Sequence, residues 1–140
     1  MKNIFSTNSN PRLNDLWLLL FRIILAVFML THGFPKFMRL IEGNIAGFPD
    51  PLGIGENMSL ILAVLGEFAA PLVIIPGIMT RLATIPVLSA MSVAAFIVHG
   101  ADPFKGREMA LLYLAGFLTI LILGPGRWSV DNLIHRRFKL

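Results

Sequence analysis

The stretch from Leu16 to Lys36 reads LWLLLFRIILAVFMLTHGFPK and decides the fold, because it is an apolar segment of membrane-spanning length that contains one charge. Arg22 is its seventh residue, and the sequence His32-Gly-Phe-Pro-Lys36 closes it. A charged side chain at such a depth costs about 2.5 to 3.5 kcal/mol on insertion scales unless it is paired. The rest of the chain must therefore supply a partner for Arg22.

The composition places the chain among membrane proteins. Its 140 residues are 56% hydrophobic and 14% charged, and this length is typical of one domain. The absence of cysteine excludes a disulfide framework, a thiolate metal site and a CxxC redox pair. A redox role would therefore use a bound small molecule or another subunit, and we predict no metal site and no intrinsic cofactor.

Four apolar segments are long enough to cross a membrane as helices, namely residues 16–33, 57–75, 82–98 and 108–123. We predict an all-α membrane protein with a four-transmembrane-helix bundle, formed by one domain over residues 16–131. Residues 1–15 are predicted to be a flexible tail and residues 132–140 a basic tail. The first external loop mixes apolar residues with glycine and proline, which predicts an interfacial segment followed by turns.

The distribution of basic residues predicts the orientation in the membrane. One side of a four-span protein would carry seven of them: Lys2, Arg12, Arg81, Arg127, Arg136, Arg137 and Lys139. The other side would carry four: Lys36, Arg39, Lys105 and Arg107. The positive-inside rule then places both termini in the cytoplasm. Because the net charge of +4 forms no long basic run, we do not expect nucleic acid as a partner.

Glu67 is the second charge within a predicted span. Counting residues from the cytoplasmic end of each helix puts Arg22 and Glu67 at nearly the same depth. We predict that they form a buried ion pair, since each ion alone would be far costlier. Pro71 adds to this expectation, because a proline leaves the carbonyl group of Glu67 without its usual donor. A pair that only fixes helix register would explain these charges as well as a catalytic role would.

Polar residues also gather near the ends of the spans. His32 and His99 end the first and third helices on the external side, with Lys36 one turn beyond His32. These three residues form a candidate ligand site for a quinone headgroup or a small anion. Alternatively, they are interfacial residues bonded to lipid headgroups and loop carbonyls, and axial haem ligation ranks low because no further motif supports it. Arg81 and Asp131 on the cytoplasmic side are predicted to be structural, as helix caps or a surface ion pair.

These motifs occur in an order that resembles the DoxX family of small four-helix membrane proteins. They are Arg22, Gly33-Phe-Pro-Lys36, Glu67, Gly77-Ile-Met-Thr-Arg81, His99 and Gly124-Pro-Gly-x-x-Ser-x-Asp131. The resemblance covers roughly residues 19–131 and implies a protein of the bacterial inner membrane. It also implies a small subunit or companion of a quinone-linked oxidoreductase, including the thiosulfate to quinone type, and it supplies no metal, flavin or haem site. The family's polar positions correspond to Arg22, Lys36, Glu67, Arg81, His99 and Asp131.

Two other functions are compatible with the same residues. The chain could be a non-catalytic accessory or scaffold subunit of a larger membrane complex, which the lack of a cofactor motif favours. It could also form a small solute or proton pathway, although four short helices would have to dimerise to enclose one. The expected partners are the lipid bilayer and either other membrane-protein subunits or a second copy of the chain.

Overall fold

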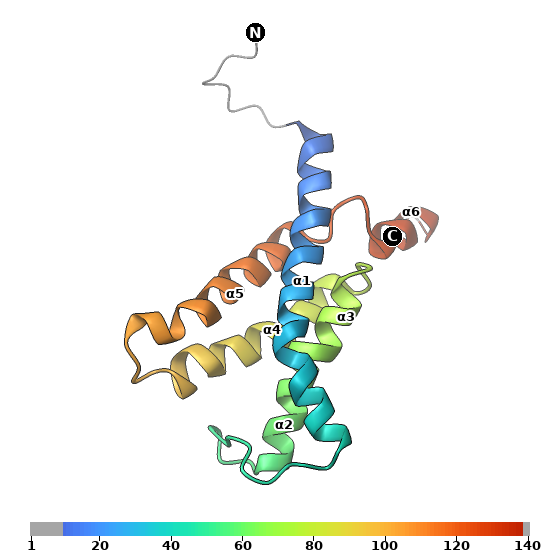
Figure 1. Ribbon diagram of the computed structural model, residues 1–140. Coiled ribbons are helices and arrows are strands. Elements are labelled where there is room, and N and C mark those ends of the chain that lie inside the picture. The colour runs from blue at the N-terminus through green and yellow to red at the C-terminus, as the bar shows by residue number, and fades with distance from the viewer. Residues whose placement is uncertain (1–9, 139–140) are drawn as a thin grey trace.

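The computed structural model describes residues 10–138 and confirms the predicted all-helical fold. Its four helices of membrane-spanning length are Pro11–Ile41, Glu56–Ile74, Thr80–Val98 and Phe104–Leu123, and no β-strand occurs among the described residues. The individual elements are α1 (Pro11–Ile41), α2 (Glu56–Val64), α3 (Ala70–Ile74), α4 (Thr80–Val93), α5 (Phe104–Leu123) and α6 (Val130–Phe138). In Figure 1 the long α1 packs along α2 and α3, and α4 and α5 lie side by side and extend away from it toward the left.

The first span starts earlier than the sequence predicted. Residues 11–15, assigned to a flexible tail, form the first turn of α1. The side chain of Asn10 caps this turn by accepting a hydrogen bond of 3.1 Å from the backbone N–H of Arg12, and Pro11 occupies a position where proline is favoured. Residues 1–9 and 139–140 of the predicted tails lie outside the described residues. The remainder of the predicted basic tail, residues 132–138, is helical and belongs to α6.

The first span also ends later than predicted. Instead of a separate interfacial segment, α1 continues through Pro35 to Ile41, and residues 42–55 follow as irregular structure and turns. Proline removes one helix hydrogen bond and usually ends or kinks a helix. Here packing supports the extension, because the ring of Phe37 stacks on that of Phe68 with 4.2 Å between centroids. Tertiary contact has therefore overridden the local signal for a break.

The second and third spans each contain one π-helical turn, at Leu65–Ala69 and Ala94–Val98. The backbone N–H of Ala70 bonds to the carbonyl of Leu65, and that of His99 bonds to the carbonyl of Ala94, so both bonds reach back five residues. Such turns accommodate one extra residue and are frequent at functional sites, because they change the direction of nearby side chains.

The register of α1 against the second span is set by Gly33. A β-carbon added at Gly33 would lie 2.1 Å from the carbonyl oxygen of Glu67 and 2.3 Å from its carbon. The two backbones therefore touch, which only glycine allows. Small residues have this role in membrane bundles because helices gain little from apolar burial when the surrounding lipid is equally apolar.

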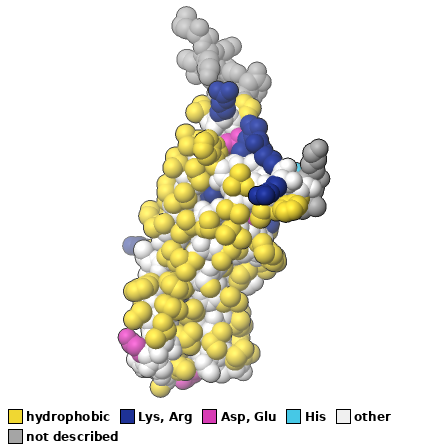
Figure 2. All heavy atoms as spheres, turned by 90° about the vertical axis from the view of Figure 1, so that its right-hand side faces the viewer, with side chains coloured by type: hydrophobic (Ala, Val, Ile, Leu, Met, Phe, Trp, Pro, Cys, Tyr) yellow, Lys and Arg dark blue, Asp and Glu magenta, His cyan; other side chains and the backbone are white. Residues whose placement is uncertain are grey.

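The surface is consistent with a bilayer around the middle of the molecule. Figure 2 shows apolar side chains over most of this face, with lysine and arginine side chains gathered toward its upper part. That part holds the start of α1 and α6 (Figure 1), and we refer to it as the α6 end. The opposite end carries the connection at residues 42–55 and is called the loop end.

Replacing Gly33 by alanine should destabilise the bundle by at least about 2 kcal/mol, although alanine normally favours a helix by up to about 1 kcal/mol. The added methyl group would meet backbone atoms that cannot rotate away. Thermal unfolding in mild detergent measures the effect.

The matched control is Gly116→Ala in α5, where the new β-carbon would lie 2.6 Å from Cδ1 of Leu25, the end of a flexible side chain. We expect a change within about 1 kcal/mol there. Equal effects of the two substitutions would show that the backbone contact at Gly33 does not set the packing.

Candidate functional site

The predicted ion pair between Arg22 and Glu67 is wrong, because the two residues lie at different depths. Glu67 is level with Gly33, which is eleven residues from Arg22, or about 16 Å along the helix. Arg22 lies beside Gly77 instead, where an added β-carbon would be 2.9 Å from Nη1. The depth comparison assumed that the helices end at one height, whereas α1 extends beyond the end of α3 at the α6 end (Figure 1).

Arg22 is held by carbonyl groups of the connection between α5 and α6. Nη1 donates to the carbonyl of Pro125 at 2.5 Å, and Nη2 donates to that of Trp128 at 2.9 Å. The residue is only 1% exposed, so these two carbonyls replace water for a buried cation. The interaction joins α1 to the segment that precedes α6.

Asp131 and Arg81 also lie at the α6 end, where each bonds to backbone. The carboxylate of Asp131 accepts hydrogen bonds from the N–H groups of Met79 and Thr80, at 2.7 and 2.8 Å. It thus caps the start of α4, which has no side-chain cap of its own. Arg81 donates to the carbonyl of Ile122 near the end of α5 at 3.4 Å. The residues that the sequence assigned to structural roles therefore join neighbouring helices here.

Lys36 is the partner of Glu67. Its Nζ lies 2.5 Å from Oε1 of the carboxylate, with the side chain of Glu67 8% exposed and that of Lys36 33% exposed. Residues three apart in a helix lie on the same face, so Lys36 lies on the same face of α1 as Gly33. Because Gly33 contacts the backbone of Glu67, Lys36 lies close to the side chain of Glu67. The sequence interpretation missed this pair because it placed Lys36 at the interface. The Gly-x-x-Lys spacing was the signal that could have revealed it.

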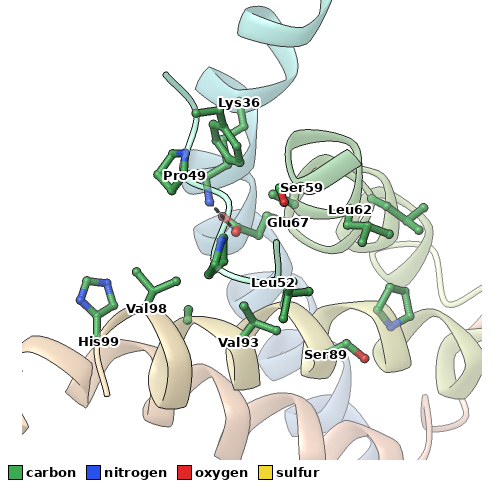
Figure 3. A pocket seen from close by; sticks show the side chains of 17 residues that line it. Lys36, Pro49, Leu52, Ser59, Leu62, Glu67, Ser89, Val93, Val98 and His99 are labelled. Atoms are coloured by element: carbon green, nitrogen blue, oxygen red, sulfur yellow. Dashed lines mark hydrogen bonds and ion pairs between the residues drawn. The ribbon is translucent and has the colours of Figure 1, made fainter. Parts of the chain in front are cut away.

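An apolar cavity of about 450 Å³ lies next to this ion pair. Its walls come from the 48–52 segment, from the second span and from the third span, and both π-helical turns contribute to it. The polar side chains that line it are those of Lys36, Glu67, Ser59, Ser89 and His99. In Figure 3 the Lys36–Glu67 pair lies on one side of the cavity, and Ser89 and His99 lie along the third span. A cavity of this size, with apolar walls and a few polar groups, is typical of small-molecule sites.

The structure brings two of the three candidate external residues to this cavity and leaves the third out. Lys36 and His99 line it, whereas His32 does not. His32 packs edge-on against Tyr113, with 5.7 Å between ring centroids. Nδ1 of His99 is 2.7 Å from Oδ2 of Asp102, so Nε2 is the ring nitrogen available to a ligand. The revised candidate site is therefore Lys36, Glu67 and His99.

Asp50 anchors the loop that forms one wall. Its carboxylate accepts hydrogen bonds from the N–H groups of Ile54 and Gly55 and from the hydroxyl of Ser59, the last at 2.7 Å. The bond from Ser59, followed by that from Gly55, lowers the pKa of Asp50 below its ordinary value. Because the folded pKa is depressed, this anchoring is fully present above the ordinary pKa and is lost as the pH falls through the lowered one. The sequence interpretation did not single out Asp50, although an Asp-Pro pair before Gly-rich turns is a local signal.

Residues 17–100 match the sequence profile of the DoxX family, which is more than half of the chain. The chain belongs to the DoxX family. The matched region contains Arg22, Gly33, Lys36, Glu67 and His99, and thus the full revised site.

Similar proteins are found in several bacteria. The inner membrane protein YqjF of Escherichia coli (strain K12) is 26% identical over 133 residues, covering 91% of this chain and 98% of that protein. An uncharacterized protein of Haemophilus influenzae is 28% identical, covering 93% of this chain and 99% of its own. The uncharacterized membrane protein Rv3486 of Mycobacterium tuberculosis is 27% identical, and the match covers 83% of this chain and 80% of that protein. No solved structure matches the chain.

Removing the charge of Lys36 alone should destabilise the protein more than removing both charges of the pair. Lys36→Met leaves the carboxylate of Glu67 without a partner inside the bundle, and we expect a loss of about 1 to 3 kcal/mol, reduced by the partial exposure of Lys36. The double variant Lys36→Met/Glu67→Gln should recover much of this loss. Unfolding in mild detergent at neutral pH measures four proteins: the original, Lys36→Met, Glu67→Gln and the double variant.

Lys105→Met is the control, because Lys105 is exposed near the start of α5 and belongs to the same side of the membrane in the predicted topology. It should leave stability within about 0.5 kcal/mol of the original. Strictly additive effects of Lys36→Met and Glu67→Gln would contradict an energetic coupling between the two residues.

Proposed function

We propose that this DoxX-family membrane protein is a small companion subunit of a quinone-linked oxidoreductase, and that its cavity receives the headgroup of a quinone. The observation that supports this is the apolar cavity with the Lys36–Glu67 ion pair and His99 on its walls. A quinone headgroup is a flat apolar ring with two carbonyl oxygens that accept hydrogen bonds. Apolar walls with a few polar groups match that chemistry.

The residues around the cavity have separate roles in this proposal. The ammonium group of Lys36 can donate to one quinone oxygen, and its own charge is balanced by Glu67. The ring of His99 can donate to the other oxygen through Nε2, with Nδ1 held by Asp102. Ser59 and Ser89 offer hydroxyl groups along the walls (Figure 3).

Reduction of a quinone to its quinol consumes two electrons and two protons, and the partner oxidoreductase supplies the electrons. His99 is suited to pass protons, because each of its two ring nitrogens can carry one and its side chain is 43% exposed. The carboxylate of Asp102 beside it is also accessible to water, so the protons given up can be replaced. Apolar contacts with the cavity walls would hold the quinone ring in place.

We infer an inner-membrane protein with the α6 end in the cytoplasm, supported by the excess of basic residues there and by the name of the Escherichia coli relative as an inner membrane protein. The cavity then lies toward the external side of the membrane.

Single cysteines test this orientation cleanly, because the chain contains no cysteine of its own. In intact spheroplasts, a membrane-impermeant maleimide should label Ala101→Cys in the loop before α5. His135→Cys in α6 should be labelled only after the membrane is permeabilised. Both substitutions keep the lysines and arginines that set the topology, and the reverse labelling pattern would contradict the proposed orientation.

Binding of decylubiquinone and of a short-chain menaquinone analogue to the purified protein tests the quinone proposal. His99→Gln should weaken binding of the preferred analogue by about tenfold, the effect of one lost hydrogen bond. Equilibrium dialysis of the detergent-solubilised protein gives the dissociation constants.

His32→Gln is the matched control, since it makes the same chemical change at a histidine outside the cavity. It should leave binding unchanged. Equal losses in both variants would show that the effect is unspecific. If the original protein binds neither analogue, alone or with a co-purifying partner, the quinone role is wrong, and a partner that still co-purifies would then indicate an accessory function.

A further inference from the structure

A second concave site lies at the α6 end, remote from the cavity described above. It has a volume of about 530 Å³, and three parts of the chain form it: the start of α1, the connection after α5, and α6. The residues that line it are Arg12, Asp15, Leu16, Arg127, Trp128 and Arg136. Three guanidinium groups and one carboxylate thus line the pocket, which leaves a net positive charge.

We propose that this pocket binds the phosphate headgroup of an anionic phospholipid. Guanidinium groups are planar donors that match the oxygen atoms of a phosphate and can bind them in pairs. Pockets of basic residues on the cytoplasmic side of membrane proteins recognise anionic headgroups in this way. Here the charges come from separate elements, so the fold and not a local run of sequence assembles the site.

The lone carboxylate in the pocket is already engaged by one of the arginines. Oδ1 of Asp15 accepts a hydrogen bond from the backbone N–H of Arg127 at 3.3 Å, and Oδ2 lies 3.9 Å from Nε of the same residue. Arg12 and Arg136 form no ion pair with any residue among 10–138. The two guanidinium groups that remain can therefore meet a phosphate with little competition from side chains of residues 10–138.

The surroundings favour a lipid over a soluble phosphate. Leu16 and Trp128 add apolar surface to the lining, and Trp128 is 65% exposed, as is typical of a tryptophan at a membrane interface. In Figure 1, α6 lies to the side of α1 and does not run along it. It carries the exposed apolar residues Leu133, Ile134 and Phe138 together with His135, Arg136 and Arg137.

A short helix of this composition lies in the interface plane, with its apolar side chains among the acyl chains and its basic ones among the headgroups. The basic side chains that gather toward the upper part of Figure 2 fit this level of the membrane. The backbone on one side of the pocket is held in place by hydrogen bonds. Arg22 bonds the 125–131 segment to α1, and Asp131 bonds it to the start of α4. A lipid held here would therefore meet a backbone segment that is bonded to two neighbouring helices.

Native mass spectrometry of the delipidated full-length protein in mild detergent tests the proposal. It compares phosphatidylglycerol with phosphatidylcholine of identical acyl chains. We expect phosphatidylglycerol to bind more tightly. The variant Arg12→Gln/Arg136→Gln should weaken its binding by about 25-fold, or about fivefold per arginine.

The control Lys105→Gln/Arg137→Gln removes two charges outside the pocket, one of them from the neighbouring residue on α6. It should change binding less than twofold. Equal weakening by both double variants, or equal binding of the two phospholipids, would overturn the proposal. Millimolar inorganic phosphate should leave phosphatidylglycerol bound, and its displacement would show that the pocket takes the free anion instead.

A measurement on the unsubstituted protein keeps the test decisive if a variant fails to fold. Raising the salt concentration should weaken phosphatidylglycerol binding steeply and leave that of phosphatidylcholine nearly unchanged. Salt-independent binding of both lipids would overturn the proposal. Because the site lies at the opposite end from Lys36 and His99, these results do not depend on whether a quinone binds.

Discussion

The contact between the backbones of Gly33 and Glu67 is the constraint on which the rest of the structure depends. Inside a bilayer, helices gain little from burying apolar surface, so close packing at small residues has to fix their relative heights. This single contact places α1 against the π-helical turn of the second span. It brings Lys36 to the carboxylate of Glu67 and sets Arg22 at the level of Gly77.

The two intramembrane charges are consequently stabilised in different ways. Arg22 is bonded to two backbone carbonyls, which carry no titratable proton. Glu67 is bonded to an ammonium group that is one-third exposed and borders a cavity. One charge therefore joins α1 to the segment before α6, and the other lies on the wall of the cavity.

Departures from regular helix gather around that cavity. Both π-helical turns contribute to its walls, and the irregular loop anchored by Asp50 forms another part. A π-helical turn is less favourable than α-helix and persists where packing or function requires it. The loop end is accordingly the less regular part of the bundle, whereas the α6 end is fixed by bonds that connect α1, α4, α5 and the segment before α6.

The sequence by itself determined the helical class, the four spans and the identity of the polar residues, because hydrophobic length and intramembrane charge are local properties that can be counted. Their partners were decided only by the tertiary structure. Counting depth from the helix ends paired Arg22 with Glu67, yet α1 extends beyond its neighbours and continues through Pro35, so the ends gave the wrong reference. Relative height depends on where two backbones touch, and that contact, at Gly33, is a property of the packed bundle and not of either segment.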